Sequence, residues 1–219
     1  MIRSLFSRAL AALLLLCCLP AWAEEAPDAL VKRVSDEVLT IVRQDKSIQA
    51  GDAKKTLDLI DAKVLPNFNF TRMTSLALGR DWRSATPAQR TALTSEFRTL
   101  LVRSYANALT RFKDYQITIK PLKAGAGDTD ATVRTTVRKA GSAPDTVDYS
   151  LEKKDGQWKV YDVAVAGVSL ITSYRDSFGQ EVKASGIDGL IASLKAKNAK
   201  NAVSGNAKIR PIMPYFGNR

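Results

Sequence analysis

Few side chains in this sequence could carry out chemistry. It contains no histidine, and its two cysteines, Cys17 and Cys18, lie in an apolar stretch near the N-terminus. If that stretch is removed on export, the mature chain has no thiol nucleophile, no disulfide and no Ser-His-Asp triad. Zinc and iron sites normally use histidine or cysteine, so they are disfavoured too. The composition therefore favours a binding protein over an enzyme, and predicts neither a metal nor another cofactor.

Asp162 is the carboxylate whose position best fits a catalytic role. It lies on a predicted strand among apolar neighbours such as Val160 and Val163. A carboxylate inside a pocket could act as a general base in a small isomerase or dehydratase. The alternative is a structural role, as a cap or in an ion pair. The absence of histidine removes the usual catalytic partner and favours the structural role.

Three arginines, Arg80, Arg83 and Arg175, are candidates for contact with an anionic head group or for docking on a partner. A guanidinium group can bind a phosphate through two parallel hydrogen bonds. Each arginine could instead be a solvated charge or could pair with an acid such as Asp176. If the head-group interpretation holds, Arg175→Ala should weaken ligand delivery more than it weakens folding.

The N-terminal segment has the features of a secretory signal peptide. Arg3 and Arg8 precede an apolar run, residues 10–19, and Ala21-Trp22-Ala23 forms a cleavage site. The run is shorter than the roughly 20 residues of a membrane-spanning helix. Lipidation of the cysteines is disfavoured because large leucines precede them. We therefore expect residues 1–23 to be removed and the mature chain to be periplasmic.

The net charge of the full chain is +11. In the periplasm nucleic acid is not a plausible target for such a charge, which suits anionic lipid head groups or acidic protein surfaces. Solubility alone is the alternative explanation. Residues 195–219 contain no acid and several lysines and arginines, and they predict a flexible basic tail.

The periodicity of the apolar residues changes along the chain. It is helical from Pro27 to about residue 112, and the helix that starts near Pro87 has a capping box formed by Thr86 and Gln89. It then alternates with a period of two in four segments. Helices follow through residues 169–182, where Ser169 can cap the N-terminus, and 187–194. The pattern predicts an α+β fold: a four-stranded antiparallel sheet covered by the N- and C-terminal helices.

Two segments carry a family resemblance: residues 78–105, with Leu78-Gly79-Arg80-Asp81-Trp82-Arg83, and residues 155–178, with Trp158-Lys159-Val160-Tyr161-Asp162-Val163. They resemble the MlaC family of periplasmic phospholipid-binding proteins, also known as toluene-tolerance proteins, over roughly residues 29–194. The resemblance implies an NTF2-like fold with a helical subdomain, here residues 24–194, that encloses acyl chains. It implies no catalysis.

The resemblance also implies a role. Such a protein carries phospholipid between an inner-membrane MCE/ABC transporter complex and an outer-membrane lipoprotein complex. We expect a monomer whose pocket is lined by apolar residues of the sheet, the long helix and the helices around them. The candidate lipid-binding residues are Phe68, Phe70, Met73, Leu76, Phe97, Leu101, Tyr105, Val133, Val137, Val147, Tyr149, Leu151, Trp158, Val160, Val168, Ile171, Tyr174 and Phe178.

Three other interpretations remain open at this point. The chain could carry another lipid, such as a hopanoid or a sterol-like molecule. It could be a small periplasmic enzyme with an NTF2-like pocket, which would show paired polar groups at the base of that pocket. It could also be an adaptor with a filled core. A carrier would show an apolar cavity with a basic rim, and an adaptor would show no cavity. Apolar periodicity alone does not distinguish a cavity from a filled core.

Overall fold

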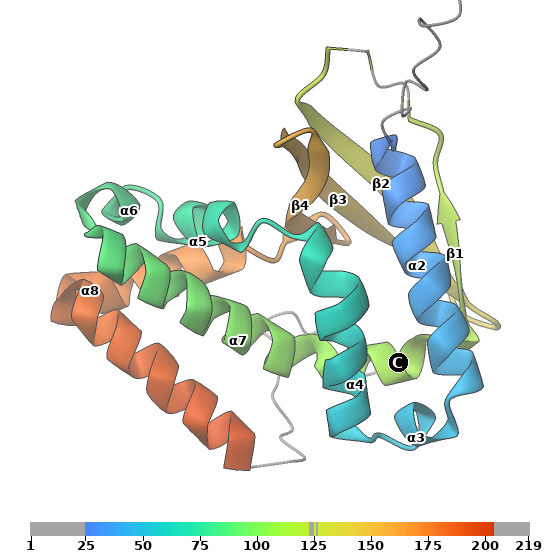
Figure 1. The fold of residues 1–219 in the computed structure, drawn as a ribbon, viewed down its shortest axis with the longest axis horizontal. Coiled ribbons are helices and arrows are strands. Elements are labelled where there is room, and N and C mark those ends of the chain that lie inside the picture. The colour runs from blue at the N-terminus through green and yellow to red at the C-terminus, as the bar shows by residue number, and fades with distance from the viewer. Residues whose placement is uncertain (1–24, 123–124, 126, 204–219) are drawn as a thin grey trace, which may run out of the picture.

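The computed structural model describes residues 25–122, 125 and 127–203. The predicted signal peptide, residues 1–23, and the predicted tail from residue 204 onward lie outside the described residues. None of the helices in the described part is long and apolar enough to cross a membrane. The described residues form an α+β fold, as predicted from the sequence (Figure 1).

The first half of the chain is helical. Its elements in chain order are α2 (Pro27–Gln44), α3 (Lys46–Gln49), α4 (Ala53–Leu59), the π-helical turn η2 (Ile60–Val64), the 3-10 turn η3 (Leu65–Asn67), α5 (Phe70–Leu78), α6 (Asp81–Ser84), α7 (Pro87–Arg111) and the 3-10 turn η4 (Phe112–Asp114). The sheet and one long helix follow. These are β1 (Tyr115–Ile119), β2 (Asp130–Lys139), β3 (Asp145–Lys154), β4 (Gln157–Val165), β5 (Val168–Ser169) and α8 (Thr172–Val203).

The sheet is an antiparallel meander with strand order β1-β2-β3-β4-β5. The four predicted strands are present, and the short β5 adds a fifth at the β4 edge. On β2 the apolar alternation predicted from the sequence is confirmed, because Val133 and Val137 are buried whereas Thr132 and Arg138 are exposed. One face of the sheet is therefore apolar, and α2 lies across it (Figure 1).

A β-bulge in β4 changes which residues face the core. Ser150 pairs with Asp162 but Leu151 pairs with Val160, so Tyr161 is an extra residue without a direct partner. Before the bulge Trp158 and Val160 are buried. A bulge of one residue shifts the side-chain alternation by one position, so the later inward-facing residues of β4 have odd numbers.

The second apolar core is formed by helices alone. It packs α5, the N-terminal half of α7 and α8 against one another, and we call these elements with α6 the helical half. Its centre is Phe97, whose ring contacts Tyr174 and Phe178 edge to face at centroid distances of 5.0 and 5.1 Å. The remaining elements, the sheet with α2, α3, α4 and the turns η2 and η3, form what we call the sheet half. The two halves lie side by side in Figure 1.

Local capping agrees with the sequence at both ends of the helical half. The Thr86 backbone N–H donates to Gln89 Oε1 at 3.0 Å, and the Gln89 N–H donates back to Thr86 Oγ1 at 3.2 Å, which confirms the capping box. Ser169 caps α8 by accepting the N–H of Thr172 at 3.0 Å. The two helices expected here form one element with a kink at Gly186, whose φ is 72°.

The predicted start of the flexible tail at Lys195 is wrong. Helix α8 continues nine residues beyond Leu194, to Val203. Asn198, on this extension, is 4% exposed, and its Nδ2 donates to the Glu96 backbone carbonyl and to the Glu96 carboxylate. The Arg103 guanidinium donates to the Asn198 carbonyl. These contacts attach the extension to α7, and no sequence periodicity indicated them.

Arg72 joins the two halves. It lies on α5, and its guanidinium donates to Glu152 of β3 and, at 3.0 Å, to Asp130 of β2. The Tyr161 ring stacks on this guanidinium, 3.6 Å from its centre. Asn69 Nδ2 donates to the second oxygen of the same Glu152 carboxylate at 2.6 Å. The extra residue of the bulge thus takes part in the junction between the halves.

Candidate functional site

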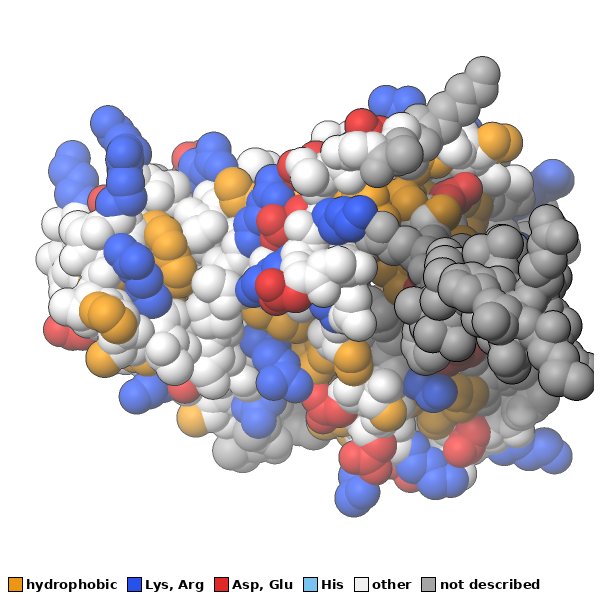
Figure 2. Space-filling view, turned by 45° about the horizontal axis from the view of Figure 1, so that its top comes forward, with side chains coloured by type: hydrophobic (Ala, Val, Ile, Leu, Met, Phe, Trp, Pro, Cys, Tyr) orange, Lys and Arg blue, Asp and Glu red, His pale blue; other side chains and the backbone are white. Residues whose placement is uncertain are grey.

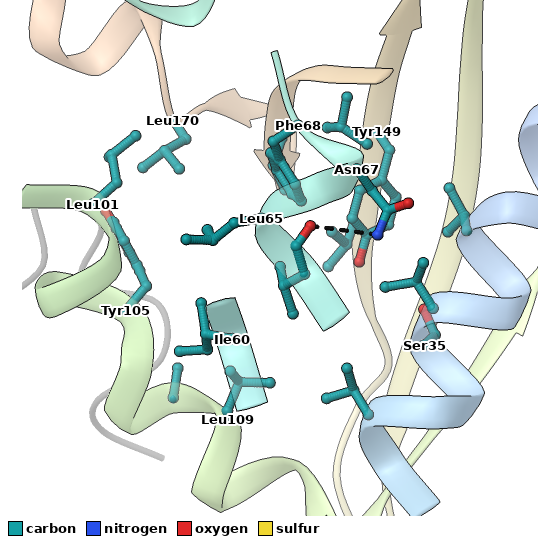
Figure 3. Close-up of a pocket in the computed structure, with 18 of the residues that line it drawn as sticks. Ser35, Ile60, Leu65, Asn67, Phe68, Leu101, Tyr105, Leu109, Tyr149 and Leu170 are labelled. Atoms are coloured by element: carbon teal, nitrogen blue, oxygen red, sulfur yellow. Dashed lines mark hydrogen bonds between the residues drawn. The ribbon is translucent and has the colours of Figure 1, made fainter. Parts of the chain in front are cut away.

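The sheet half encloses a cavity of about 320 Å³. It lies between the inner face of the sheet, α2, the segment from α4 to η3, and the C-terminal half of α7 (Figure 3). Leu101, Tyr105 and Leu109 of α7 form one wall, and Tyr149 of β3 lies on the opposite one (Figure 3). The volume is at the lower end of the range for ligand pockets, about 300–1,000 Å³.

The lining of the cavity is almost entirely hydrocarbon. No lysine, arginine, aspartate or glutamate is among the residues that line it. Among the lining residues only Ser35, Asn67, Tyr105 and Tyr149 have polar side chains. Such a surface favours a long apolar ligand, since burying apolar area is favourable at about 25 cal/mol per Å². It provides no pair of charged groups for acid–base chemistry.

The cavity exists because successive turns of α2 pack against different partners. Leu30 and Val31 pack on the sheet, next to Val133 and Val160. Val38 and Val42, two and three turns later, pack instead against Ile48 and Leu59 of α3 and α4. The Arg43 guanidinium fixes the far end of α2 by donating to the carbonyls of Lys113 and Tyr115. Between these two clusters the helix does not fill the space above the sheet.

The irregular segment η2–η3 forms another wall. Ile60, Val64 and Leu65 line the cavity from it. The π-helical turn is followed by a 3-10 turn that contains Pro66. Side chains donate hydrogen bonds to backbone carbonyls of this irregular segment, and Asn67 Nδ2 donates to the Lys63 carbonyl at 2.8 Å. Lys159 of β4 donates to the Pro66 carbonyl at 2.8 Å. Turns of this kind inside helices are often found at functional sites.

Two tyrosines, Tyr105 and Tyr149, line the cavity. Burial raises the pKa of Tyr149 to about 12. The Tyr105 hydroxyl is buried without a hydrogen-bond partner of adequate geometry among the described residues. Burial raises the pKa of Tyr105 as well, and the nearby Tyr174 raises it further. Figure 3 shows the Tyr105 hydroxyl near Leu101, at the junction with the helical half.

Half of the lipid-binding residues predicted from the sequence line the cavity. These are Phe68, Phe70, Met73, Leu101, Tyr105, Val137, Val147, Tyr149 and Val160. The other half do not line it. Leu76, Phe97, Ile171, Tyr174 and Phe178 pack in or against the helical core. Val133, Leu151 and Trp158 are buried beneath the N-terminal end of α2, and Val168 is 49% exposed on β5. Whether any of them contacts a lipid stays a prediction.

Two of the groups of lining residues that sequence reasoning missed are informative. The first lies on α2 and the segment after it, including Val34, Val38 and Ile60, whose helical spacing indicated only a buried face. The second is Val163 and Val165 of β4, which the bulge turns toward the cavity. The signal for the second group was the change in alternation after Asp162, where the apolar residues move from even to odd positions.

The three candidate arginines lie outside the cavity lining, in the helical half. Arg175 donates from Nε and Nη2 to the Leu76 carbonyl, at 3.2 and 3.0 Å, and so caps the last turn of α5. Arg80 and Arg83 are exposed around α6. In Figure 2 basic side chains are scattered over the helical half, at the left, and acidic side chains lie among the basic ones near the middle. Contact with a head group stays a prediction for all three.

Asp162 has a structural environment. Its Oδ1 accepts the N–H groups of Val163 and Ile171, and its Oδ2 accepts the Ser169 hydroxyl. The carboxylate therefore fixes the junction of β4, β5 and α8, and it is not among the cavity-lining residues. This arrangement agrees with the structural interpretation of Asp162. Over the described ranges no three His, Cys, Asp or Glu side chains are grouped so that they could hold a metal ion.

The fold and the cavity together define a class: an α+β binding protein that encloses an apolar ligand between a sheet and helices. A comparison with models of protein families identifies one family. The family model of the MlaC protein matches residues 32–196, and the chain belongs to the MlaC family, as its sequence motifs indicated.

Two curated relatives and one solved structure agree with this assignment. The chain is 28% identical over 178 residues to the intermembrane phospholipid transport system binding protein MlaC of Haemophilus influenzae, covering 80% of this chain and 83% of that protein. It is 28% identical over 186 residues to the toluene tolerance protein ttg2D of Pseudomonas putida, covering 84% and 86%. The phospholipid-binding protein of Ralstonia solanacearum, solved with a phospholipid, is 38% identical with a TM-score of 0.74, covering 80% of this chain and 98% of that one.

Proposed function

We propose that this chain is a periplasmic phospholipid carrier and not an enzyme. The observation that carries the proposal is the cavity in the sheet half, which is apolar apart from four side chains and has no charged residue in its lining. Acyl chains fit such a lining, and a charged head group does not. The Ralstonia relative of the same fold was solved with a phospholipid, which supports the choice of ligand.

A carrier of this kind must enclose its ligand for a simple physical reason. Exposing one methylene group to water costs about 0.8 kcal/mol, so releasing two long chains costs on the order of 20 kcal/mol. Spontaneous release into water is then negligibly slow. Lipid would leave only when the carrier docks on a partner that offers a continuous apolar path.

The partners that fit this requirement are membrane complexes. The Haemophilus relative belongs to an intermembrane phospholipid transport system. We infer that this chain likewise exchanges lipid with an inner-membrane MCE/ABC transporter and an outer-membrane lipoprotein complex. Residues 1–23 would direct export to the periplasm, and the basic residues after Val203 would be available for docking.

Native mass spectrometry tests the proposal directly. The mature chain is purified without detergent, and the expected result is one diacyl phospholipid bound per chain. A delipidated sample should regain that mass when it is mixed with phospholipid vesicles. An empty chain that takes up no phospholipid would contradict the proposal. A co-purified polycyclic lipid without acyl chains would instead identify a hopanoid-type carrier.

A further inference from the structure

Three of the four polar side chains of the cavity lie on one wall. Ser35 comes from α2, Asn67 from η3 and Tyr149 from β3, three elements that are far apart in the sequence. Figure 3 shows their polar ends on the same side of the cavity, opposite Leu101 and Tyr105. The hydroxyl end of Tyr149 points away from β3 toward the region between Asn67 and α2 (Figure 3).

Two of these groups have unused hydrogen-bond donors. Neither the Tyr149 hydroxyl nor the Ser35 hydroxyl forms a hydrogen bond with another described residue. Asn67 is different, because its Nδ2 already donates to the carbonyls of Lys63 and Val64. The free donors of this wall are therefore the two hydroxyls, while the amide of Asn67 maintains the turn beside them, and the unpaired Tyr105 hydroxyl belongs to the opposite wall.

A free hydroxyl in an apolar cavity is unfavourable unless the ligand bonds it. Buried polar groups are nearly always hydrogen-bonded in folded proteins, and leaving one unpaired lowers stability. Phenylalanine would fill the space of the Tyr149 ring without that penalty. The hydroxyl thus points to a ligand that brings a hydrogen-bond acceptor into the cavity next to its apolar part.

The missing charges restrict what that acceptor can be. Because the lining has no basic residue, a phosphate would lie in the cavity without a counter-charge, which is costly. In a diacyl lipid the neutral acceptors next to the chains are the ester carbonyls that link them to glycerol. We propose that the Tyr149 hydroxyl, together with the Ser35 hydroxyl on the same wall, binds these ester carbonyls and so selects ester-linked lipids. This inference rests on the proposed function.

The test compares two lipids that differ only in the linkage. Delipidated full mature protein is titrated with a phosphatidylglycerol that has two ester-linked chains and with its ether-linked analogue of equal chain length. The wild type should bind the diester about threefold to tenfold more tightly, as expected for one neutral hydrogen bond. Tyr149→Phe should lose most of that preference with an unchanged affinity for the diether, and Ser35→Ala should lose a smaller part.

Tyr161→Phe provides the matched control. It removes the same hydroxyl from a tyrosine whose ring stacks on Arg72 and does not line the cavity, so it should keep the ester preference. Unfolding curves of all variants show that they are folded. Equal binding of both lipids by the wild type, or a full ester preference in Tyr149→Phe, would overturn the inference and leave the carrier function standing. Failure of the wild type to bind either lipid would overturn both.

Discussion

The helical half and the sheet half use the same kinds of side chains with opposite results. Leucine, valine, phenylalanine and tyrosine supply both interiors. In the helical half, three helices pack closely enough for Phe97, Tyr174 and Phe178 to meet edge to face. In the sheet half, successive turns of α2 pack against different partners, the irregular turn η2 forms another wall, and a cavity remains. Backbone geometry thus decides whether an apolar face becomes a core or a binding site.

Helix α7 belongs to both halves, which makes the comparison testable within one element. Leu93, in its N-terminal part, is fully buried in the helical core, whereas Leu109, four turns later, lines the cavity. Leu93→Ala should lower the free energy of unfolding by about 2–5 kcal/mol, because it creates a hole in a filled core. Leu109→Ala should cost clearly less, because its side chain already borders empty space.

Chemical denaturation of the delipidated chain measures both values. The Leu109 variant serves as the control for the Leu93 variant, since the helix and the substitution are the same. Equal losses for the two variants would mean that the sheet half is as well filled as the helical half.

Filling the cavity should separate binding from stability. Val147→Trp places a large ring into the cavity, and a ring that excludes four methylene groups should weaken phospholipid binding by about 3 kcal/mol, roughly 100-fold. Its stability should fall by less than the 1–3 kcal/mol typical of an overpacked core. Leu190→Trp, in the filled helical core, should show the reverse: reduced stability, with normal binding by the chains that stay folded. Lipid titration and denaturation of both variants give the four values.

The pH dependence of stability should report the buried Tyr149 hydroxyl. The pKa of Tyr149 is raised from 10.0 to about 12 in the folded chain. Between these two pH values the unfolded chain ionises Tyr149 while the folded chain keeps it neutral, so stability falls as the pH rises. The full effect is about 3 kcal/mol, lost by the time the pH exceeds 12. It is measured as the difference between wild type and Tyr149→Phe from pH 9 to 12, and a constant difference would show that Tyr149 is solvated.

The junction between the halves should contribute a smaller amount. Arg72→Ala removes the partner of Glu152, whose side chain is 18% exposed, and should cost about 1–2 kcal/mol because hydrogen bonds to a charged, partly buried group are lost. Lys54→Ala breaks an exposed pair with Asp58 and serves as the control, with a change close to zero. If the free energy of unfolding falls equally little in both variants, the two halves are held together by apolar contacts alone.

Arg175→Ala should have a smaller effect on stability than Arg72→Ala. Its hydrogen bonds reach one carbonyl of α5 from an exposed position, so the expected loss is about 0.5–1 kcal/mol. A role in contact with head groups predicts that lipid transfer between vesicles falls by more than this loss explains. Unchanged transfer would restrict Arg175 to capping α5.

The sequence predicted the elements better than the cavity. The alternation on β2, the capping box at Thr86 and the cap at Ser169 are local patterns, and all three are present. Phe97 and Tyr174 were expected at the pocket but lie in the helical core, because periodicity shows that a side chain is buried and not what it faces. The contribution of α2 depends on the angle at which it crosses the sheet, which is set by contacts distant in the sequence.

The bulge at Tyr161 determines which side chains of β4 face the cavity. It does so through the number of residues in the strand and not through their type. Val163 and Val165 face the ligand space because Tyr161 is left out of the pairing with β3. If Tyr161 were paired in a regular strand, or if one residue were inserted after Asp162 without a second bulge, both valines would turn outward and their neighbours would turn inward, a change that no single substitution at these valines can make. Relatives of this chain could therefore reshape one wall of the pocket in a single step, by gaining a residue in this strand.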